Sequence, residues 1–316
     1  MNCREEKTVA VMDVGSNTIK LLVASGTQDS SLLPLLEHSD PTRIGTGIGK
    51  DAPVLSETSM TEGVKAVERL FEKVEPFAPT AWRIVATGAV RDASNGTTFA
   101  EKIQTKTGHA LEILSGEEEA EGIASGLATD DEIARRASFL ACDLGGGSLE
   151  LIRVEKNATR AAQSLPLGAV RLTERFLADP TSPISCEELE RIFAHVREVL
   201  FTSGFPLQAP GSELVATGGA FVSARAVLAE REAIPFEERA KLSKQDLAGL
   251  LAETRSLTAE QRIERFPALP PNRADITPAA LACILALMET ASAETALNSL
   301  RNLRYGIAAS MLAYSS

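Results

Sequence analysis

Two α/β domains are the fold that the sequence predicts, and three observations point to it. The chain has 316 residues, about twice the length of a typical domain. Short apolar runs typical of buried strands alternate with segments whose apolar residues recur at helical spacing. A strand–turn–strand pattern near the N-terminus also occurs a second time in mid-chain. We place the domain boundary after residue 126, and we expect the last helix, about residues 304–316, to pack back on the first domain.

The elements of the first domain are predicted from apolar patterning. Residues 57–74 carry apolar side chains at helical spacing and stop before Pro76, which predicts a helix of that length. Ser115 and Glu118 have the spacing of a capping box, so another helix is expected from there to about Leu127. Strands are expected over residues 8–14, 18–24, 32–37, 83–87 and 111–114, and a further helix over 99–107.

The second domain repeats this mixture of strands and helices. Strands are expected over residues 138–143, 149–155, 161–165 and 214–217, with helices starting at 168 and 186 and spanning 221–229. The remainder is predicted to be mostly helical, interrupted by the proline-rich segment 266–271. The most apolar stretch, residues 279–288, is too short to cross a bilayer and predicts a buried helix.

The composition is that of a soluble globular protein, with 44% apolar and 24% charged residues. Lysine and arginine total 32 against 43 acidic residues, so the net charge is −11 and general binding to nucleic acid or an anionic membrane is not expected. The three histidines and four cysteines have no zinc-site spacing. Residues 1–10 are polar and lack the apolar core of a signal peptide, and these features together predict a cytoplasmic location.

The internal repeat is the most informative feature of the chain. Asp13-Val-Gly-Ser-Asn-Thr-Ile-Lys-Leu-Leu22 aligns without gaps on Asp143-Leu-Gly-Gly-Gly-Ser-Leu-Glu-Leu-Ile152. Glycine and hydroxyl residues in such a turn let a phosphate approach backbone N–H groups closely, and the aspartate before it can hold Mg²⁺ directly or through water. Two unrelated β-hairpins are the alternative, since Asp and Gly are common turn residues. A third glycine turn, Thr217-Gly218-Gly219, favours phosphate binding.

These motifs resemble those of the exopolyphosphatase / guanosine pentaphosphate phosphohydrolase family, which belongs to the superfamily of actin, sugar kinases and heat-shock chaperone ATPases. The resemblance covers essentially the whole chain. Further matching segments follow in the family's order: Arg43–Gly49, Ala86–Asn95, Ser115–Ala120, Leu167–Leu172, Thr217–Gly219 and Arg273–Asp275. The resemblance implies two actin-like (ribonuclease H-like) domains, an active site in the cleft between them, Mg²⁺ and a phosphoanhydride substrate.

The resemblance also assigns roles to individual residues. It implies that Glu119 orients or deprotonates the attacking water, although three successive acids in a first helical turn ordinarily stabilise the helix dipole. Arg91 is expected to clamp phosphate, with Arg43 a weaker candidate of the same kind. Asp143, Glu150 and Asp13 are expected to hold magnesium; for Glu150 taken alone, an exposed strand residue is the alternative. The expected phosphate-binding residues are Gly15, Ser16, Asn17, Thr18, Gly145, Gly146, Gly147, Ser148 and Gly218.

Three functions remain open at this point. The first is an exopolyphosphatase that releases orthophosphate from inorganic polyphosphate, and the second removes the 5′ γ-phosphate of guanosine pentaphosphate. The third is a weakly catalytic regulator that binds alarmone nucleotides or polyphosphate. Its only support is Tyr305, which stands where the family usually has glutamate. Lys20 is a separate departure from the family pattern: the family often has arginine there, and lysine keeps the positive charge but loses the fork geometry. An actin-like kinase fits the ordered motifs less well, and a homodimer is neither indicated nor excluded.

Overall fold

The computed structural model describes residues 7–27 and 32–313. The chain divides into two compact units: unit 1 comprises the residues up to 135 and those from 301 on, and unit 2 comprises residues 136–300. Compactness alone does not test where an independently folding domain ends, so the boundary predicted after residue 126 stays a prediction. The first six residues of the chain and the last three of the helix predicted at 304–316 lie outside the described residues.

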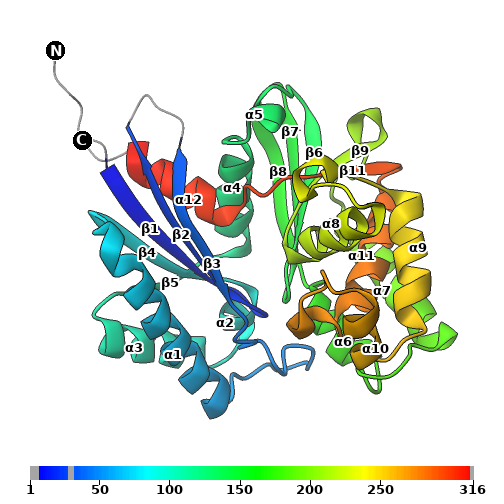
Figure 1. The fold of residues 1–316 in the computed structure, drawn as a ribbon, viewed down its shortest axis with the longest axis horizontal. Helices are drawn as coiled ribbons and strands as arrows, with labels where there is room; N and C mark the ends of the chain where they lie inside the picture. Colours follow the sequence, from blue (N-terminus) through cyan, green and yellow to red (C-terminus); the bar gives the residue numbers. More distant parts are fainter. Residues whose placement is uncertain (1–6, 28–31, 314–316) are drawn as a thin grey trace. The chain divides into compact units, whose positions relative to one another are not determined.

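Unit 1 is built on a five-stranded sheet in the order β3-β2-β1-β4-β5 (Figure 1). The first three strands are antiparallel neighbours, whereas β4 and β5 continue the sheet in parallel with β1. Along β1 the side chains alternate between the two faces, and Ala10, Met12 and Val14 belong to the core that α1 and α3 cover. The strands are β1 (Lys7–Val14), β2 (Ile19–Gly26), β3 (Leu33–Asp40), β4 (Ala81–Ala86) and β5 (Leu111–Ile113).

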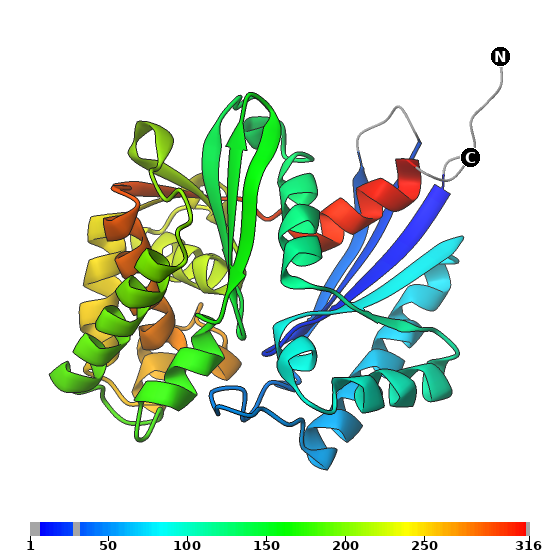
Figure 2. The same ribbon diagram turned by 180° about the vertical axis from the view of Figure 1, so that it is seen from behind.

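Helices pack on both faces of this sheet. On one face α1 contacts α3 and β2; on the other, α12 contacts β1 and β2 and crosses α4 (Figure 2, red and green). The crossing is close because an added Cβ at Gly306 would overlap the carbonyl oxygen of Gly122. The helices are α1 (Glu57–Val74), α2 (Gly88–Asp92), α3 (Gly96–Thr107), α4 (Gly116–Leu127), α5 (Asp131–Ala134) and α12 (Leu303–Ala313).

Unit 2 contains a six-stranded sheet in the order β8-β7-β6-β9-β11-β10. Three antiparallel strands are again followed by strands parallel to the central one, and β10 adds an antiparallel edge. The two units therefore share the order and directions of five strands, as expected for related domains, and both are of the predicted α/β class. The strands are β6 (Phe139–Leu144), β7 (Leu149–Glu155), β8 (Ala158–Leu165), β9 (Glu213–Thr217), β10 (Lys241–Ser243) and β11 (Thr295–Asn298).

The helices of unit 2 gather around α11, in which Pro278 to Met288 are all buried, as its apolar sequence predicts. Both α7 and α9 pack on it, and α6 contacts it as well. No helix of the described residues is long and apolar enough to cross a membrane. The helices are α6 (Ala169–Phe176), α7 (Cys186–Thr202), α8 (Gly219–Glu232), α9 (Lys244–Arg255), α10 (Ala259–Arg265) and α11 (Thr277–Thr290).

The remainder of the chain is mostly helical, as expected, but two short strands of unit 2 were not predicted. Both β10 and β11 are short, three and four residues, and their sequences have no run long enough to show an alternating pattern. Strand β11 forms because β9 and β10 offer it backbone partners on both sides, which is a tertiary effect.

Candidate functional site

In unit 1, the predicted site residues lie at one edge of the sheet. Strands β1, β4 and β5 are parallel, so the segments that follow them leave the sheet at the same side. The loop 15–18 follows β1, Arg91 lies in α2 after β4, and Glu119 lies in α4 after β5. The carboxyl edge of parallel strands is the usual ligand-binding position in open α/β sheets.

The loop 15–18 is compact and mostly buried. Ser16, Asn17 and Thr18 are each less than a tenth exposed. Asp13 precedes the loop and lies directly opposite Lys20 in the β1–β2 pairing. Its side chain is partly exposed, yet its Oδ1 atom is buried and has no hydrogen-bond partner among the described residues. Burial raises the pKa of Asp13, and the charges of Lys20 and Arg304 oppose that rise.

Glu119 and Arg91 form an ion pair that the sequence did not predict. The Arg91 Nη1 atom donates to Glu119 Oε2 at 2.6 Å, and the two side chains are only 19% and 9% exposed. Arg91 Nη1 also donates to the carbonyl oxygen of Leu114 at 3.3 Å. The capping of α4 is carried out by Ser115 and Glu118, as predicted, so Glu119 is not needed for it.

In unit 2, the second copy of the motif forms a matching loop, residues 145–148, after β6. Gly145 donates its N–H to the carbonyl oxygen of Ser148 at 3.1 Å, which closes the turn. Asp143 and Glu150 are directly opposite each other in the β6–β7 pairing, so their side chains share one face of the sheet. Glu150 is 2% exposed and accepts a hydrogen bond from Ser164 Oγ at 2.7 Å. The alternative of an exposed strand residue is therefore wrong for Glu150.

The third glycine turn lies beside Asp143. Gly218 has a positive φ of 99°, and an added Cβ there would overlap the Asp143 Oδ1 atom. At Gly219 an added Cβ would overlap the guanidinium of Arg273. Thus glycine at both positions lets a carboxylate and a cation approach the N-terminus of α8. Arg273 belongs to a segment that resembles a family motif, and that motif was the only signal in the sequence for its position here.

The C-terminal helix α12 places Arg304 and Tyr305 in buried positions of unit 1, with contacts that the sequence did not predict. Arg304 is 5% exposed, and it donates to the carbonyl oxygen of Leu21 at 2.6 Å and to Glu37 at 3.1 Å. The neighbouring Tyr305 is 2% exposed, with the Arg301 guanidinium 4.2 Å from its ring centroid. Burial, together with the charge of Glu37 and a hydrogen bond to it, raises the pKa of Tyr305 to about 12, although Arg301 and Arg304 oppose the rise.

The candidate ligands are carboxylates, which are hard oxygen ligands of the kind that magnesium takes. Within the described residues, no three histidine, cysteine or acidic side chains gather as a metal-binding group. Magnesium is typically held by one or two carboxylates, with water and substrate phosphate completing its shell. The facing carboxylates of Asp143 and Glu150 match that pattern, and the orphaned Oδ1 of Asp13 is a buried acceptor suited to a cation.

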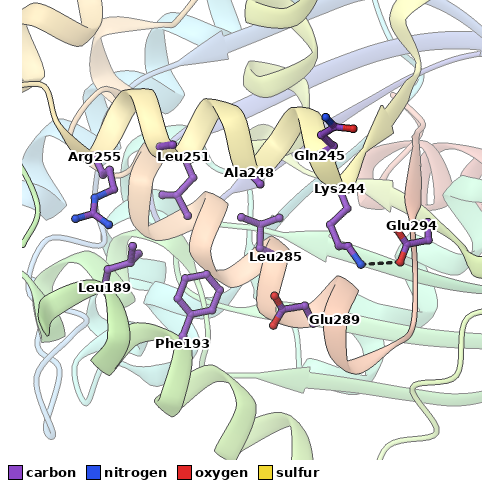
Figure 3. A pocket seen from close by; sticks show the side chains of 11 residues that line it. Leu189, Phe193, Lys244, Gln245, Ala248, Leu251, Arg255, Leu285, Glu289 and Glu294 are labelled. Atoms are coloured by element: carbon purple, nitrogen blue, oxygen red, sulfur yellow. Dashed lines mark hydrogen bonds and ion pairs between the residues drawn. The ribbon is translucent and has the colours of Figure 1, made fainter. Parts of the chain in front are cut away.

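Two cavities lie in the part of the chain that the structure describes, and no predicted site residue lines either of them. One, of about 430 Å³, lies between α7 and α9 over α11; Leu189, Phe193 and Leu285 line it, and Lys244 pairs with Glu294 at its rim (Figure 3). The other, about 650 Å³, lies between α1 and α3 of unit 1. The candidate site consists of the strand edges and glycine loops of each unit. The cleft predicted between the domains stays a prediction.

Solved structures share this fold across almost the whole chain. They include an exopolyphosphatase from Cytophaga hutchinsonii, with a TM-score of 0.83 and 24% identity over 97% of this chain and 98% of that one. The Aquifex aeolicus member of the Ppx/GppA protein family has a TM-score of 0.77 and 24% identity over 98% of both chains. At this identity the likeness establishes the fold.

Sequence relatives extend the comparison. An uncharacterised protein of Streptomyces coelicolor is 32% identical over 276 residues, which is 84% of this chain and 78% of that protein. A guanosine-5′-triphosphate,3′-diphosphate pyrophosphatase of Vibrio vulnificus is 33% identical over 171 residues, 54% of this chain; the matched part spans only 33% of that protein's length. The model of the Ppx/GppA phosphatase family matches residues 22–315. The chain therefore belongs to the Ppx/GppA phosphatase family.

Proposed function

We propose that this protein is a magnesium-dependent exopolyphosphatase that releases orthophosphate from the end of inorganic polyphosphate. The observation that carries the proposal is the buried carboxylate of Glu119, held by Arg91 at the strand edge where the loop 15–18 also lies. Phosphoanhydride hydrolysis needs neutralised phosphate charge and a positioned water more than covalent chemistry by the protein. The family membership and the cradle-like glycine loops support the same assignment.

In this proposal Glu119 accepts a proton from the attacking water. A bond forms between the water oxygen and the terminal phosphorus, and the bond from that phosphorus to the bridging oxygen breaks, which leaves a chain one phosphate shorter. Each unit has its own phosphate-binding groups: the backbone N–H groups of loop 15–18 in unit 1, and those of loop 145–148 and Gly218 in unit 2. Arg91 orients Glu119 and is near enough to the same edge to contact phosphate.

In unit 2, Asp143 and Glu150 would hold magnesium, directly or through water; in unit 1, Asp13 is the residue suited to the same role. The facing carboxylates and the orphaned buried oxygen described above support this assignment. When bound, the ion supplies neutralisation of the negative charge on the phosphates. The scattered cysteines support a cytoplasmic location for the activity.

A guanosine pentaphosphate 5′-phosphohydrolase is the alternative, because the relative from Vibrio vulnificus carries a related activity in its name. A weakly catalytic regulator that binds alarmone nucleotides or polyphosphate is supported by Tyr305 alone, and the intact carboxylates count against it. All three hypotheses use the same strand edges. The preferred substrate separates the two hydrolases, and the absence of appreciable turnover would separate the regulator from both.

The deciding experiment is phosphate release by the purified protein with magnesium from long-chain polyphosphate, guanosine pentaphosphate and ATP, each repeated with excess chelator. We expect release mainly from polyphosphate and its loss with chelator. A clear preference for guanosine pentaphosphate would replace the proposed activity with the alternative. Binding without release from any substrate would favour the regulator.

A further inference from the structure

The glycine loop 145–147 rests on the first turn of α6, which the resemblance left without a role. The N–H of Ala169 donates to the Gly145 carbonyl oxygen at 3.0 Å, and those of Val170 and Arg171 donate to the Gly146 oxygen at 2.9 and 3.2 Å. The side chain of Arg171 completes the set, because its Nε atom donates to the Gly147 carbonyl oxygen at 2.8 Å. Three successive carbonyl groups of the loop are thus hydrogen-bonded to one short helix.

This pattern determines which way the loop amides point. In a trans peptide the C=O and the following N–H point in opposite directions. Because the carbonyl groups of residues 145, 146 and 147 point toward α6, the N–H groups of residues 146, 147 and 148 point away from it. Successive N–H groups on one side form a concavity that binds anions. The helix α6 therefore orients the amides that the proposed function assigns to phosphate.

The close approach of α6 to the loop requires glycine at its N-cap. Gly168 has an ordinary φ of −66°, so its backbone conformation is open to other residues. An added Cβ there, however, would overlap the carbonyl oxygen of Gly146 and the carbonyl carbon of Gly147. The glycine is needed for space, and the helix N-terminus could not reach the loop with a larger residue.

Unit 1 uses the same arrangement with a different element. The N–H of Gly45 donates to the Ser16 carbonyl oxygen at 2.8 Å, and that of Arg43 donates to the Asn17 carbonyl oxygen at 3.1 Å. The Arg43 Nε atom donates to Asn17 Oδ1 at 3.1 Å, and Arg43 has a positive φ of 47°. An added Cβ at Gly45 would lie 2.7 Å from the Ser16 Cβ. Each phosphate loop is therefore backed by one close-packed glycine and one arginine that donates to the loop.

We propose that Arg171 and Arg43 are positioning residues, which hold the two loops so that their amides face the phosphate. This inference rests on the proposed function of those loops as phosphate cradles. It differs from the sequence-based expectation for Arg43, which was a direct clamp on phosphate. Because the arginines act through the loop, their loss should affect orientation of the bound phosphate, and hence turnover, more than ground-state affinity.

The test is steady-state hydrolysis of inorganic polyphosphate by Arg171→Ala, Arg171→Lys and Arg175→Ala. Arg175 lies one turn further along α6 and is exposed, so it is a matched control. We expect Arg171→Ala to lower kcat about 10- to 100-fold with KM changed less than about threefold, since small misplacements of reacting groups have effects of that size. Arg171→Lys keeps a donor of similar reach and should recover most of the loss, and Arg175→Ala should match the wild type.

Two results would overturn the inference while leaving the proposed function intact: an unchanged kcat in Arg171→Ala, or the same loss in the Arg175→Ala control. If kcat falls in every Arg171 variant only in proportion to a lowered unfolding midpoint, the role of Arg171 is purely structural. If the wild type hydrolyses nothing, the proposed function fails instead, and hydrogen exchange of the loop amides takes over as the test. The amides of residues 146–148 should then exchange faster in Arg171→Ala than in the wild type and in Arg175→Ala, because the Arg171 hydrogen bond to the loop is lost. Equal exchange in all three would refute the positioning role.

Discussion

The ion pair between Arg91 and Glu119 allows the catalytic assignment to be separated from a structural one. Glu119→Gln removes the charge but keeps the shape and an oxygen that accepts the Arg91 N–H. Exposed ion pairs contribute about 0–1 kcal/mol, and breaking a fully buried pair costs about 3–5 kcal/mol. With side chains 19% and 9% exposed and an acceptor retained, we expect this substitution to lower the free energy of unfolding by about 1–2 kcal/mol.

The effect on turnover should be much larger. A general base contributes about 10²- to 10⁴-fold, which corresponds to about 2.7–5.4 kcal/mol of activation free energy. Turnover is measured as phosphate release from polyphosphate at saturating magnesium. Stability is measured by urea unfolding followed through Trp82, the single tryptophan of the chain, which lies in β4 of unit 1 and stacks on Phe71. The probe therefore reports on the unit that carries the substitution.

A second carboxylate–guanidinium pair provides the matched control. Arg83 and Glu112 lie 2.5 Å apart on neighbouring strands β4 and β5, but their side chains are 34% and 44% exposed. Glu112→Gln should change the free energy of unfolding by less than about 1 kcal/mol and leave turnover unaltered. Turnover of Glu119→Gln within a few-fold of an active wild type would refute our choice of base. An equal loss in the control would show that the effect is not specific to the site.

The remaining predictions concern the metal, the third glycine turn, pH and the C-terminal helix. Asp143→Asn should raise the magnesium concentration needed for half-maximal phosphate release, and an unaltered requirement would count against it as a ligand. Gly218→Ala should lower the free energy of unfolding in urea by about 1–3 kcal/mol, because residue 218 has a φ of 99°. The new Cβ would also overlap the Asp143 Oδ1 atom and displace that carboxylate. Wild-type stability would contradict this. The raised pKa of Asp13 means that the folded state holds its proton more tightly and loses stability as pH rises through that pKa. Asp13→Asn should therefore raise the urea midpoint more at pH 8 than at pH 4, and the reverse order would refute the sign. Tyr305→Phe should lower the free energy of unfolding by about 1 kcal/mol, because the hydrogen bond to Glu37 is lost. A double variant that lacks both side-chain groups tests whether the two residues are coupled.

Much of the fold followed from local sequence patterns. The helix predicted over residues 57–74 has those bounds, because its apolar spacing and terminal signals all act within the segment. The capping box at Ser115 and Glu118 formed as predicted for the same reason. The repeat of the aspartate–glycine motif anticipated two sheets with one topology, since equal local sequences form equal strand–turn–strand units. The resemblance of the ordered motifs likewise identified the family before any geometry was known.

Other features depended on which segments the tertiary structure brings together. Glu119 meets Arg91 only because parallel pairing of β4 and β5 sends their following helices out at one edge. Arg304 donates to the Leu21 carbonyl oxygen although the two residues are 283 positions apart in the sequence. Arg171 donates to the Gly147 carbonyl oxygen from a separate helix. The sequence by itself determined most of the elements, the repeat and the residue types of the site, but not the short strands β10 and β11. Their pairing was decided by tertiary packing, because hydrogen bonds and ion pairs between distant residues leave no periodic trace in a single sequence.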